Sequence, residues 1–451
     1  MDKTTAAGGT MTRVRWLILA MLFAVTTVNY ADRATLSIAG TALARDLGLS
    51  PITMGYAFSA FGWSYVLAQL PGGWLLDRFG SKKVYFASIF SWSVFTALQG
   101  GISFLTATVG TAVVALFALR LLVGLAEAPS FPANGRIVAA WFPAKERGTA
   151  SAIFNSAQYF ATVLFAPLMG WVTHAFGWPM VFWLMGAIGI VASLVWLKVV
   201  DNPVTHPAAN AAEIAYIERG GGLVRMDQDE HTQSGTFIDQ TPKWDYIRQL
   251  LGNRMLLGVY VGQYCINTLT YFFLTWFPIY LVKERGFSIL NAGVVSALPA
   301  ICAFGGGVLG GVLSDALIRR GRTLTMARKL PIVVGMLLST SMVACNYVQS
   351  STLVVAIMAL AFFGKGLGAL GWAVVSDTSP KEIAGLSGAL FNTFGAVAAI
   401  TTPIIIGYLV SGTGSFDAAL VFVAANALVT VSCYLVVVGD IHRVVLAKTG
   451  R

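Results

Sequence analysis

The sequence predicts an all-α membrane protein in which twelve transmembrane helices form two six-helix bundles, with both termini in the cytoplasm. Three observations lead to this prediction: the apolar composition, the series of long apolar runs, and the one-sided distribution of basic residues. Of the 451 residues, 56% are hydrophobic and only 11% are charged, and the mean hydropathy is +0.72. Soluble proteins carry about 25% charged residues. The composition therefore excludes a soluble enzyme, a nucleic-acid binder and a secreted scaffold.

The spans are predicted from the apolar runs, because a stretch of about 20 apolar residues crosses the bilayer as a helix that pairs its own backbone groups. Eleven further runs follow the first, which we therefore do not expect to be a cleaved signal peptide. The twelve expected spans are residues 14–40, 52–76, 82–103, 107–129, 147–172, 177–199, 254–282, 289–317, 328–348, 352–376, 384–411 and 415–438.

The orientation of the spans follows from the basic residues. If the N-terminus is cytoplasmic, 24 of the 30 Lys and Arg residues lie in or beside the inside segments. Only Arg45, Lys283 and Arg285 fall in outside loops, and Arg33, Arg120 and Lys365 lie within spans. Cytoplasmic loops are enriched in Lys and Arg. Both termini are therefore expected inside.

The expected domain organisation has five parts. A polar segment of mixed charge separates the sixth span from the seventh and contains three consecutive glycines, Gly220 to Gly222. Such a segment is typical of a linker between two helical bundles. The expected parts are a cytoplasmic N-terminus (1–13), an N-terminal bundle (14–200), a cytoplasmic linker (201–253), a C-terminal bundle (254–438) and a cytoplasmic tail (439–451).

The two halves of the sequence repeat. Phe154-Asn155 matches Phe391-Asn392 at an offset of 237 residues, and Gly170 matches Gly407 at the same offset. Pro143-Ala-Lys-Glu146 and Pro380-Lys-Glu382 lie in corresponding loops. Two parallel six-helix repeats with a site between them at mid-membrane are the pattern of a secondary transporter of the rocking type.

The loop after the second span carries a motif. It reads Gly73-x-x-x-Asp77-Arg78-x-Gly80-x-Lys82-Lys83, and Gly311-x-x-x-Asp315 repeats its start. This motif resembles the signature of the major facilitator superfamily. The resemblance implies gating at the cytoplasmic side, where Asp77 pairs with neighbouring helix ends and the basic residues meet anionic lipid. The alternative is a short turn that only obeys the orientation rule.

A narrower resemblance covers nearly the whole chain. Asn29-Tyr-Ala-Asp-Arg33, Glu127-Ala-Pro-Ser-Phe-Pro132 and Trp141-Phe-Pro143 resemble segments of the anion:cation symporter family. Phe154-Asn-Ser-Ala-Gln-Tyr-Phe160 and Gly364-Lys-Gly366 are most similar to its bacterial members that carry the sugar diacids D-glucarate and galactarate. The resemblance implies import of a sugar-acid anion across the bacterial inner membrane, by proton symport with alternating access.

Five ionisable residues lie well within the predicted spans: Asp32, Arg33, Arg120, Glu127 and Lys365. Each costs at least about 2.5–3.5 kcal/mol at the bilayer centre, so each is a functional candidate. Structural pairing is the alternative for each, and Asp32 is an expected partner for Arg120. Lys365 lies between two glycines in the middle of the tenth span. We expect Arg33 and Lys365 to bind the two carboxylates of a diacid, one from each bundle.

Polar and aromatic side chains are expected to complete the site, because sugar hydroxyls need donors and acceptors and an aromatic ring covers an apolar sugar face. Trp372 lies seven residues after Lys365 and is expected to share its helix face. The candidates are Tyr30, Tyr65, Gln158, Asn267, Tyr271, Trp372 and Asn392. The resemblance implies substrate contact for all of these except Asn267 and Tyr271, and also for Arg33. It implies proton coupling for Asp32 and Glu127, to which we add Arg120.

Other function classes lack support in the sequence. No Walker-type phosphate loop and no metal-ligand spacing of Cys or His is present, so we expect no cofactor and no metal. The expected partners are the substrate anion, the proton and the lipid bilayer, not nucleic acid, and the expected state is a monomer. An intramembrane enzyme using Asp32 and Glu127, a channel, a transporter of a monoacid such as galactonate, and an organic-anion exchanger remain the alternatives.

Overall fold

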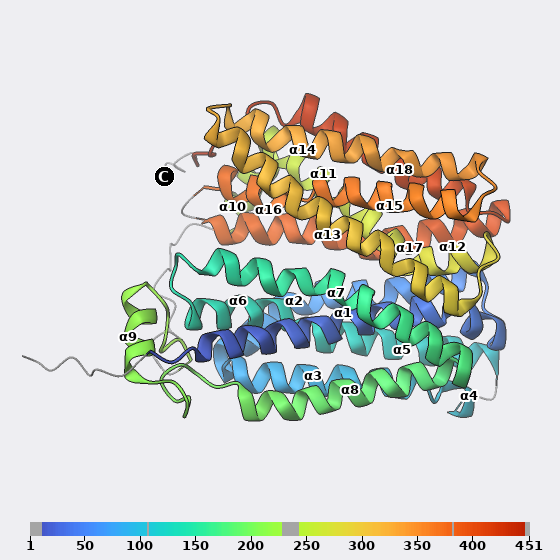
Figure 1. The fold of residues 1–451 in the computed structure, drawn as a ribbon, viewed down its shortest axis with the longest axis horizontal. Coiled ribbons are helices and arrows are strands. Elements are labelled where there is room, and N and C mark those ends of the chain that lie inside the picture. The colour runs from blue at the N-terminus through green and yellow to red at the C-terminus, as the bar shows by residue number, and fades with distance from the viewer. Residues whose placement is uncertain (1–10, 106–107, 228–242, 381–382, 447–451) are drawn as a thin grey trace, which may run out of the picture.

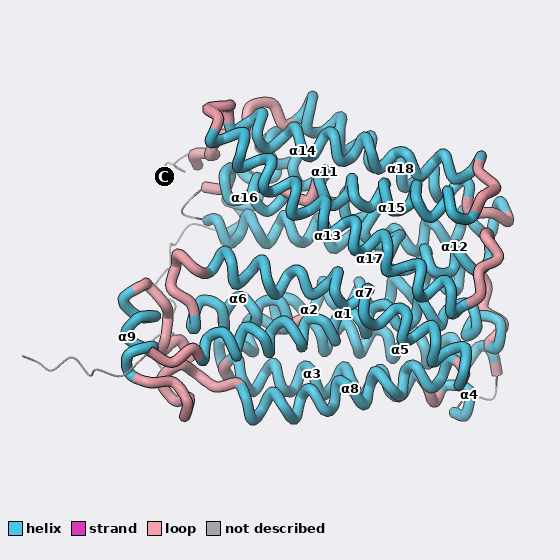
Figure 2. Tube along the Cα trace, viewed as in Figure 1, coloured by secondary structure: helices cyan, strands magenta, loops and turns pink. Residues whose placement is uncertain are grey.

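The computed structural model describes residues 11–105, 108–227, 243–380 and 383–446. Lys381 and Glu382 of the repeated loop, part of the predicted linker and both chain ends lie outside the described residues. Within the described ranges every regular element is helical (Figure 2). The elements up to residue 199 are α1 (Val14–Asp46), α2 (Pro51–Phe79), α3 (Ser81–Gln99), α4 (Ile102–Leu105), α5 (Val109–Glu127), α6 (Ser130–Trp141), α7 (Arg147–Phe176) and α8 (Trp178–Val199).

The second half of the chain is built in the same way. Two short helices precede it, α9 (Ala211–Arg219) and α10 (Lys243–Gly252). The elements that follow are α11 (Arg254–Tyr271), the π-helix η2 (Phe272–Trp276), α12 (Phe277–Lys283), α13 (Ile289–Arg319), α14 (Leu324–Ser339), the 3₁₀-helix η3 (Thr340–Tyr347), α15 (Ser351–Leu367), α16 (Gly371–Thr378), α17 (Ala384–Thr413), α18 (Asp417–Ser432) and the π-helix η5 (Cys433–Val437).

The helices lie nearly side by side in two halves, α1–α8 and α11–α18 (Figure 1). At one end of the molecule, here called the α9 end, α9 lies beside the start of α1, and the last described residues lie at the same end. The opposite end, where α4 lies, is called the α4 end. Ten helical segments of the described chain are long and apolar enough to cross a membrane. The other two predicted spans correspond to α2 and α3, which both pack against α5.

Two of the predicted spans are broken helices. The fourth span was expected to end at residue 129, but the helix bends at Ala128-Pro129 and continues as α6 to Trp141. The tenth is divided between Leu367 and Gly371 into α15 and α16. Proline removes a backbone donor and clashes with the preceding turn, so the break at Pro129 has a local cause. Broken helices in membranes are tolerated where they face protein or a cavity.

Glycines bring the two halves into close contact at two places, and the internal repeat relates these two places. A side-chain carbon added at Gly293 of α13 would lie 2.6 Å from the Ala166 carbonyl oxygen of α7. One added at Gly55 of α2 would lie 2.6 Å from the Pro403 carbonyl oxygen of α17. Small residues permit such backbone approach between membrane helices. These contacts lie toward the α4 end, where α1 ends and α2 begins.

The predicted linker contains a docked helix. The buried Glu213 of α9 accepts hydrogen bonds from Thr12 Oγ1 (2.7 Å), from the backbone N–H groups of Val14 and Arg15 (2.9 and 3.2 Å), and from Arg15 Nη1 (3.1 Å). The carboxylate thus caps the N-terminus of α1, where the helix dipole favours negative charge. Arg15 also bonds Glu146, at 3.2 Å. The linker is therefore anchored to the first half by buried charges.

Replacing Glu213 with Ala should destabilise the protein, because it leaves the Arg15 guanidinium and the first turn of α1 with fewer partners. Breaking a buried ion pair costs about 3–5 kcal/mol. Thermal unfolding of the detergent-solubilised protein, followed by a thiol-reactive dye that detects the buried Cys265, Cys345 and Cys433, measures this. The exposed Glu218 of the same helix provides the control Glu218→Gln, which should unfold at the wild-type temperature. Equal unfolding temperatures for all three proteins would contradict the anchoring role.

Candidate functional site

A buried ion pair lies at the centre of the first half. Arg33 Nε of α1 donates to Glu127 Oε2 of α5 at 2.8 Å, and the two side chains are 6% and 0% exposed. Glu127 occupies the last turn of α5, directly before the Pro129 break. A carboxylate at a helix C-terminus is unfavourable with the helix dipole. The Arg33 guanidinium offsets that unfavourable placement, so neither charge is buried alone.

Aromatic rings surround the Arg33 guanidinium. Its central carbon lies 4.9 Å from the ring centre of Tyr30, 4.7 Å from that of Phe61 and 4.9 Å from that of Tyr65. Tyr65 in turn stacks on Phe61. Rings within about 6 Å of a cation attract it through their quadrupoles. The guanidinium is therefore enclosed by three aromatic rings and by Glu127, and its Nη2 has no hydrogen-bond partner among the described residues.

Asp32 and Arg120 are both buried beside this pair. The guanidinium of Arg120 lies 5.6 Å from the Phe61 ring centre, and Thr96 of α3 lies beside Asp32. Within the described chain no ion pair joins Arg120 to Asp32, the partner expected for it. Arg120 Nε and Asp32 Oδ2 are buried without a hydrogen-bond partner among the described residues. Each of these groups thus keeps an unused bonding capacity inside the bundle.

A cavity lies between the halves. Tyr30 of α1 and Gln158 of α7 line it from the first half, and Lys365 of α15 lines it from the second. Lys365 is 5% exposed, and its Nζ lies 5.8 Å from the Tyr159 ring centre and 5.4 Å from that of Phe362. Among the described residues no carboxylate forms an ion pair with it. A buried ammonium group thus faces the cavity with aromatic rings as its neighbours.

The helix break affects two of the predicted residues. Lys365 lies in the middle of the tenth span, as expected, and also in the last turn of α15, where a cation is favourable with the helix dipole. Trp372 was expected to share its face. That expectation is wrong, because α15 ends at Leu367 and Trp372 belongs to α16. Trp372 is 57% exposed and packs edge-on against Phe391 rather than lining the cavity.

The remaining predicted residues lie at the boundary of the two halves. Asn392 of α17 donates through Nδ2 to Gln69 Oε1 of α2 at 3.2 Å, which joins one half to the other. Asn267 accepts from Gln263 at 3.4 Å within α11. Tyr271 ends α11, directly before the π-helix η2. Of all the predicted substrate-binding residues, the structure brings Tyr30, Gln158 and Lys365 together around one cavity. Asn392, Asn267 and Tyr271 do not line that cavity.

Some residues of the site were missed from sequence. Phe61 packs on both buried arginines, and Tyr159 and Phe362 flank Lys365. An aromatic residue in an apolar span carries no distinguishing signal of its own. A signal was available in the repeat: at an offset of 238 residues Glu127 corresponds to Lys365 and Arg33 to Tyr271. Glu127 and Lys365 each lie in the last turn before a helix break, and their charges are opposite.

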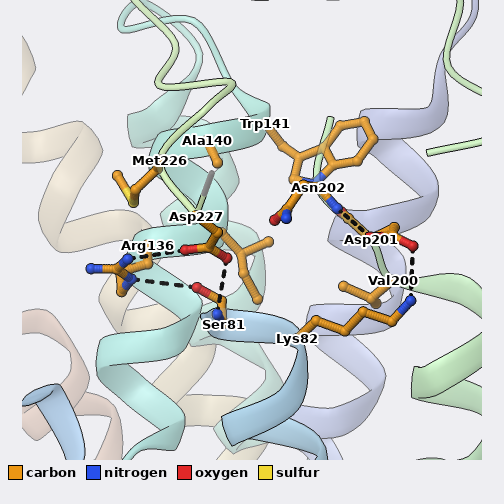
Figure 3. Close-up of a pocket in the computed structure, with 11 residues that line it drawn as sticks. Ser81, Lys82, Arg136, Ala140, Trp141, Val200, Asp201, Asn202, Met226 and Asp227 are labelled. Atoms are coloured by element: carbon orange, nitrogen blue, oxygen red, sulfur yellow. Dashed lines mark hydrogen bonds and ion pairs between the residues drawn. The ribbon is translucent and has the colours of Figure 1, made fainter. Parts of the chain in front are cut away.

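The motif residues lie at the α9 end. Arg136 of α6 pairs with Asp77 at the end of α2 and, through Nη2, with Asp227 at 3.0 Å. Asp227 also accepts from the Ser81 backbone N–H at 2.9 Å, as Figure 3 shows beside the Lys82–Asp201 pair. The guanidinium of the neighbouring Arg78 lies over the rings of Trp74 and Phe79. The residue Asp227 of the linker was not expected in this network.

The second copy of the motif makes the corresponding contacts. Asp315 at the end of α13 lies 3.8 Å from Arg328 Nη1, and Arg328 Nε bonds Asp377 of α16 at 2.8 Å. A side-chain carbon added at Gly73 or Gly311 would meet no atom within 4 Å. Both aspartates thus pair inside their own half, while both glycines leave open space beside them. Among the described residues, the ion pairs of both motif aspartates stay within one half.

Comparison with known proteins identifies the family. The model for the Major Facilitator Superfamily matches residues 22–327. The chain belongs to the Major Facilitator Superfamily. It is 66% identical to the "Probable galactarate/D-glucarate transporter GudP" of Bacillus subtilis (strain 168), with 98% of this chain and 95% of that one covered. It is 62% identical to the protein of the same name in Escherichia coli (strain K12), with 96% of each covered.

More distant relatives share the length of the chain. A "D-galactonate transporter" of Escherichia coli O6:H1 is 41% identical over 96% of this chain and 97% of its own. Among solved structures, an inward-facing, occupied bacterial homologue of the lysosomal transporter Spinster superposes with a TM-score of 0.73 at 16% identity, covering 95% and 97% of the two chains. That structure shows the fold alone. The chain is thus a multi-pass membrane transporter of this superfamily and not an enzyme.

Replacing Asp77 or Asp315 with Asn should shift the conformational population toward a state open at the α9 end, because a latch stabilises one state only. Exposed ion pairs contribute about 0.2–1 kcal/mol, so the population ratio should change by about fivefold or less. Spin labels on the exposed Arg219 of α9, which is anchored to the first half, and on the exposed Arg320 at the end of α13 in the second half measure this distance distribution. The exposed Asp417 at the start of α18 offers the control Asp417→Asn. Unchanged distributions in both motif variants would count against a latch.

Proposed function

We propose that this protein is a secondary active transporter that imports a sugar diacid, D-glucarate or galactarate, across the bacterial inner membrane by proton symport. It works as a monomer of twelve spans with both termini cytoplasmic. The names of the relatives above 60% identity support the substrate class. The rocking of two bundles, 14–200 and 254–438, about the glycine contacts gives alternating access, and the helical linker 201–253 joins them.

Lys365 is the observation that carries the diacid assignment. Its buried ammonium group faces a cavity between the halves, and the described residues offer it no carboxylate partner. A charge in such a place costs several kcal/mol unless it is paired. The carboxylate of a bound substrate supplies that pair. A second carboxylate on the same molecule then reaches the first half, where Tyr30 and Gln158 line the cavity.

Arg33 is the anchor for this second carboxylate, and Glu127 controls it. While Glu127 is ionised it occupies the guanidinium at 2.8 Å. Protonation of Glu127 removes the attraction and releases Arg33 toward Tyr30, whose ring lies between Arg33 and the cavity. Asp32 and Arg120 adjust the charge beside the pair. Proton binding and substrate binding are coupled in this scheme because both act on the same guanidinium.

The alternative substrate is a sugar monoacid. The relative named for D-galactonate supports this alternative, because it shares two fifths of the residues over nearly the whole chain. Exchange of organic anions is a further mode open to the same site. Uptake and counterflow of labelled D-glucarate, galactarate, gluconate and galactonate in proteoliposomes test the proposal. Accumulation of a monoacid with no accumulation of either diacid would overturn the assignment of substrate.

Lys365→Asn should weaken diacid transport and reduce or reverse the preference for diacid over monoacid, because it removes one anchor. A hydrogen bond to a charged group contributes about 1.5–3 kcal/mol, so the ratio should fall by about tenfold or more. Competition of unlabelled acids against labelled D-glucarate uptake measures the ratio. The exposed Lys198 at the end of α8 provides the control Lys198→Asn, which should keep the wild-type ratio.

Arg33→Lys separates the two anchors. It should harm diacids and monoacids alike, because the carboxylate that binds Arg33 is common to both and lysine lacks the planar fork of arginine. The same competition assay reads this out. An unchanged diacid-to-monoacid ratio in Lys365→Asn would show that Lys365 is not the second anchor.

Asp32→Asn and Glu127→Gln should each abolish proton-driven accumulation of substrate while leaving exchange of substrate across the membrane. A neutral side chain at either position fixes the bundle in the protonated state, so the cycle no longer moves protons. Accumulation under an imposed pH gradient and counterflow without a gradient measure the two modes. The exposed Asp417→Asn serves as the control. Full proton-driven accumulation in both variants would exclude these carboxylates from coupling.

A further inference from the structure

A set of buried polar side chains in the first half takes no part in the substrate cavity. Each member is at most 1% exposed and keeps a polar atom without a hydrogen-bond partner among the described residues. The members are Asn29, Tyr85, Thr96, Gln99 and Asn134. Leaving a buried polar group unpaired costs about 1–3 kcal/mol, and such groups in proteins are almost always paired, by water where no side chain serves.

The set follows the axis of the bundle. Gln99 and Thr96 lie on the last turns of α3, toward the α4 end, and Thr96 lies beside Asp32. Asn29 of α1 lies beside Glu127. Tyr85, near the start of α3, faces Thr26 and Asn134, and Asn134 Nδ2 of α6 donates to Thr26 Oγ1 at 3.1 Å. The polar groups thus continue from the two carboxylates toward the α9 end.

This polar line is separate from the substrate cavity. The cavity is lined from the first half by residues of α1 and α7, and none of the five members lines it. The polar line lies among α1, α3, α5 and α6. The apolar side chains of Ile89, Trp92 and Ile137 pack around it. Glu127 stands between the two regions: Oε2 bonds Arg33, while Oε1 is buried and has no partner among the described residues.

We propose that this polar line holds a chain of buried waters through which Glu127 releases its proton toward the α9 end, apart from the path of the substrate. The inference rests on the proton symport proposed above. The O–H bond of the Glu127 carboxyl breaks and its proton forms an O–H bond on an adjacent water. Proton transfer along the waters held beside Asn29, Tyr85, Thr26 and Asn134 then delivers one proton to solvent at the α9 end, each water passing on one proton as it receives another. The carboxylate left behind pairs with Arg33.

The charges around Glu127 favour this direction. Asp32 and Arg33 come from α1, Arg120 from α5, Tyr65 from α2 beside Arg33, Tyr85 from α3 and Tyr271 from α11. A proton that left toward the cavity would pass the Arg33 guanidinium, which repels it. The side toward Asn29 and Tyr85 presents neutral groups that can donate and accept hydrogen bonds. Water needs two to four such partners in a buried site.

Tyr85→Phe and Asn134→Leu test the path. We expect each to slow proton-driven substrate uptake about tenfold, which corresponds to about 1.4 kcal/mol in the barrier, and to slow proton entry by the same factor. Counterflow of labelled D-glucarate at equal pH should stay within about twofold of wild type, or about 0.4 kcal/mol. A pH-sensitive dye trapped in proteoliposomes reports the protons. Tyr434→Phe, which removes a buried hydroxyl without a described partner in the second half, should match wild type in both assays.

The outcomes separate this inference from the function on which it rests. Wild-type proton entry in both Tyr85→Phe and Asn134→Leu would overturn the path and leave symport intact. An equal loss of counterflow and of proton-driven uptake would also overturn it, because the residues would then support the fold or substrate binding. Absence of substrate-dependent proton entry in the wild type itself would overturn symport, and the path with it.

Discussion

The ion pair between Arg33 and Glu127 is the interaction on which the rest of the first half depends. Burial of either charge alone is expensive, whereas the pair and the three rings around the guanidinium make both tolerable. Only Oε2 of Glu127 engages Arg33, so Glu127 Oε1 and Arg33 Nη2 are left without a hydrogen-bond partner among the described residues. Exchange of this pair for a substrate carboxylate is the coupling that we propose.

Helix breaks position the charges of both halves. Glu127 ends α5 and Lys365 ends α15, each directly before a break within a span, and the repeat places them at corresponding positions. The helix dipole favours the lysine there and disfavours the glutamate. The second half therefore holds a buried cation without a carboxylate partner among the described residues, and the first half holds an anion paired with Arg33. The two repeated halves thus carry opposite charges at corresponding positions, Glu127 and Lys365.

The two halves meet where side chains are small. Gly55 with Pro403, and Gly293 with Ala166, bring backbones together toward the α4 end. At the α9 end the motif aspartates pair within their own halves, through Arg136 and Arg328. The linker takes part there, since Asp227 shares Arg136 and Glu213 caps α1. The glycine contacts between the halves thus lie toward the α4 end, whereas the ion pairs of the motif aspartates lie within the halves at the α9 end.

The sequence by itself determined the membrane class, the superfamily and the buried ionisable residues, because these follow from composition, local motifs and the cost of charge among apolar residues. The repeat could also be recognised from the sequence, because local motifs recur in it at a nearly fixed offset. Only the tertiary structure decided which charges meet. Arg33 pairs with Glu127, 94 residues away, and Arg120 forms no ion pair with Asp32 in the described chain. It also showed that Trp372 leaves the face of Lys365, since a break between Leu367 and Gly371 cancels helical periodicity. Pairing partners and helix breaks depend on the packing of distant helices, which local patterns do not contain.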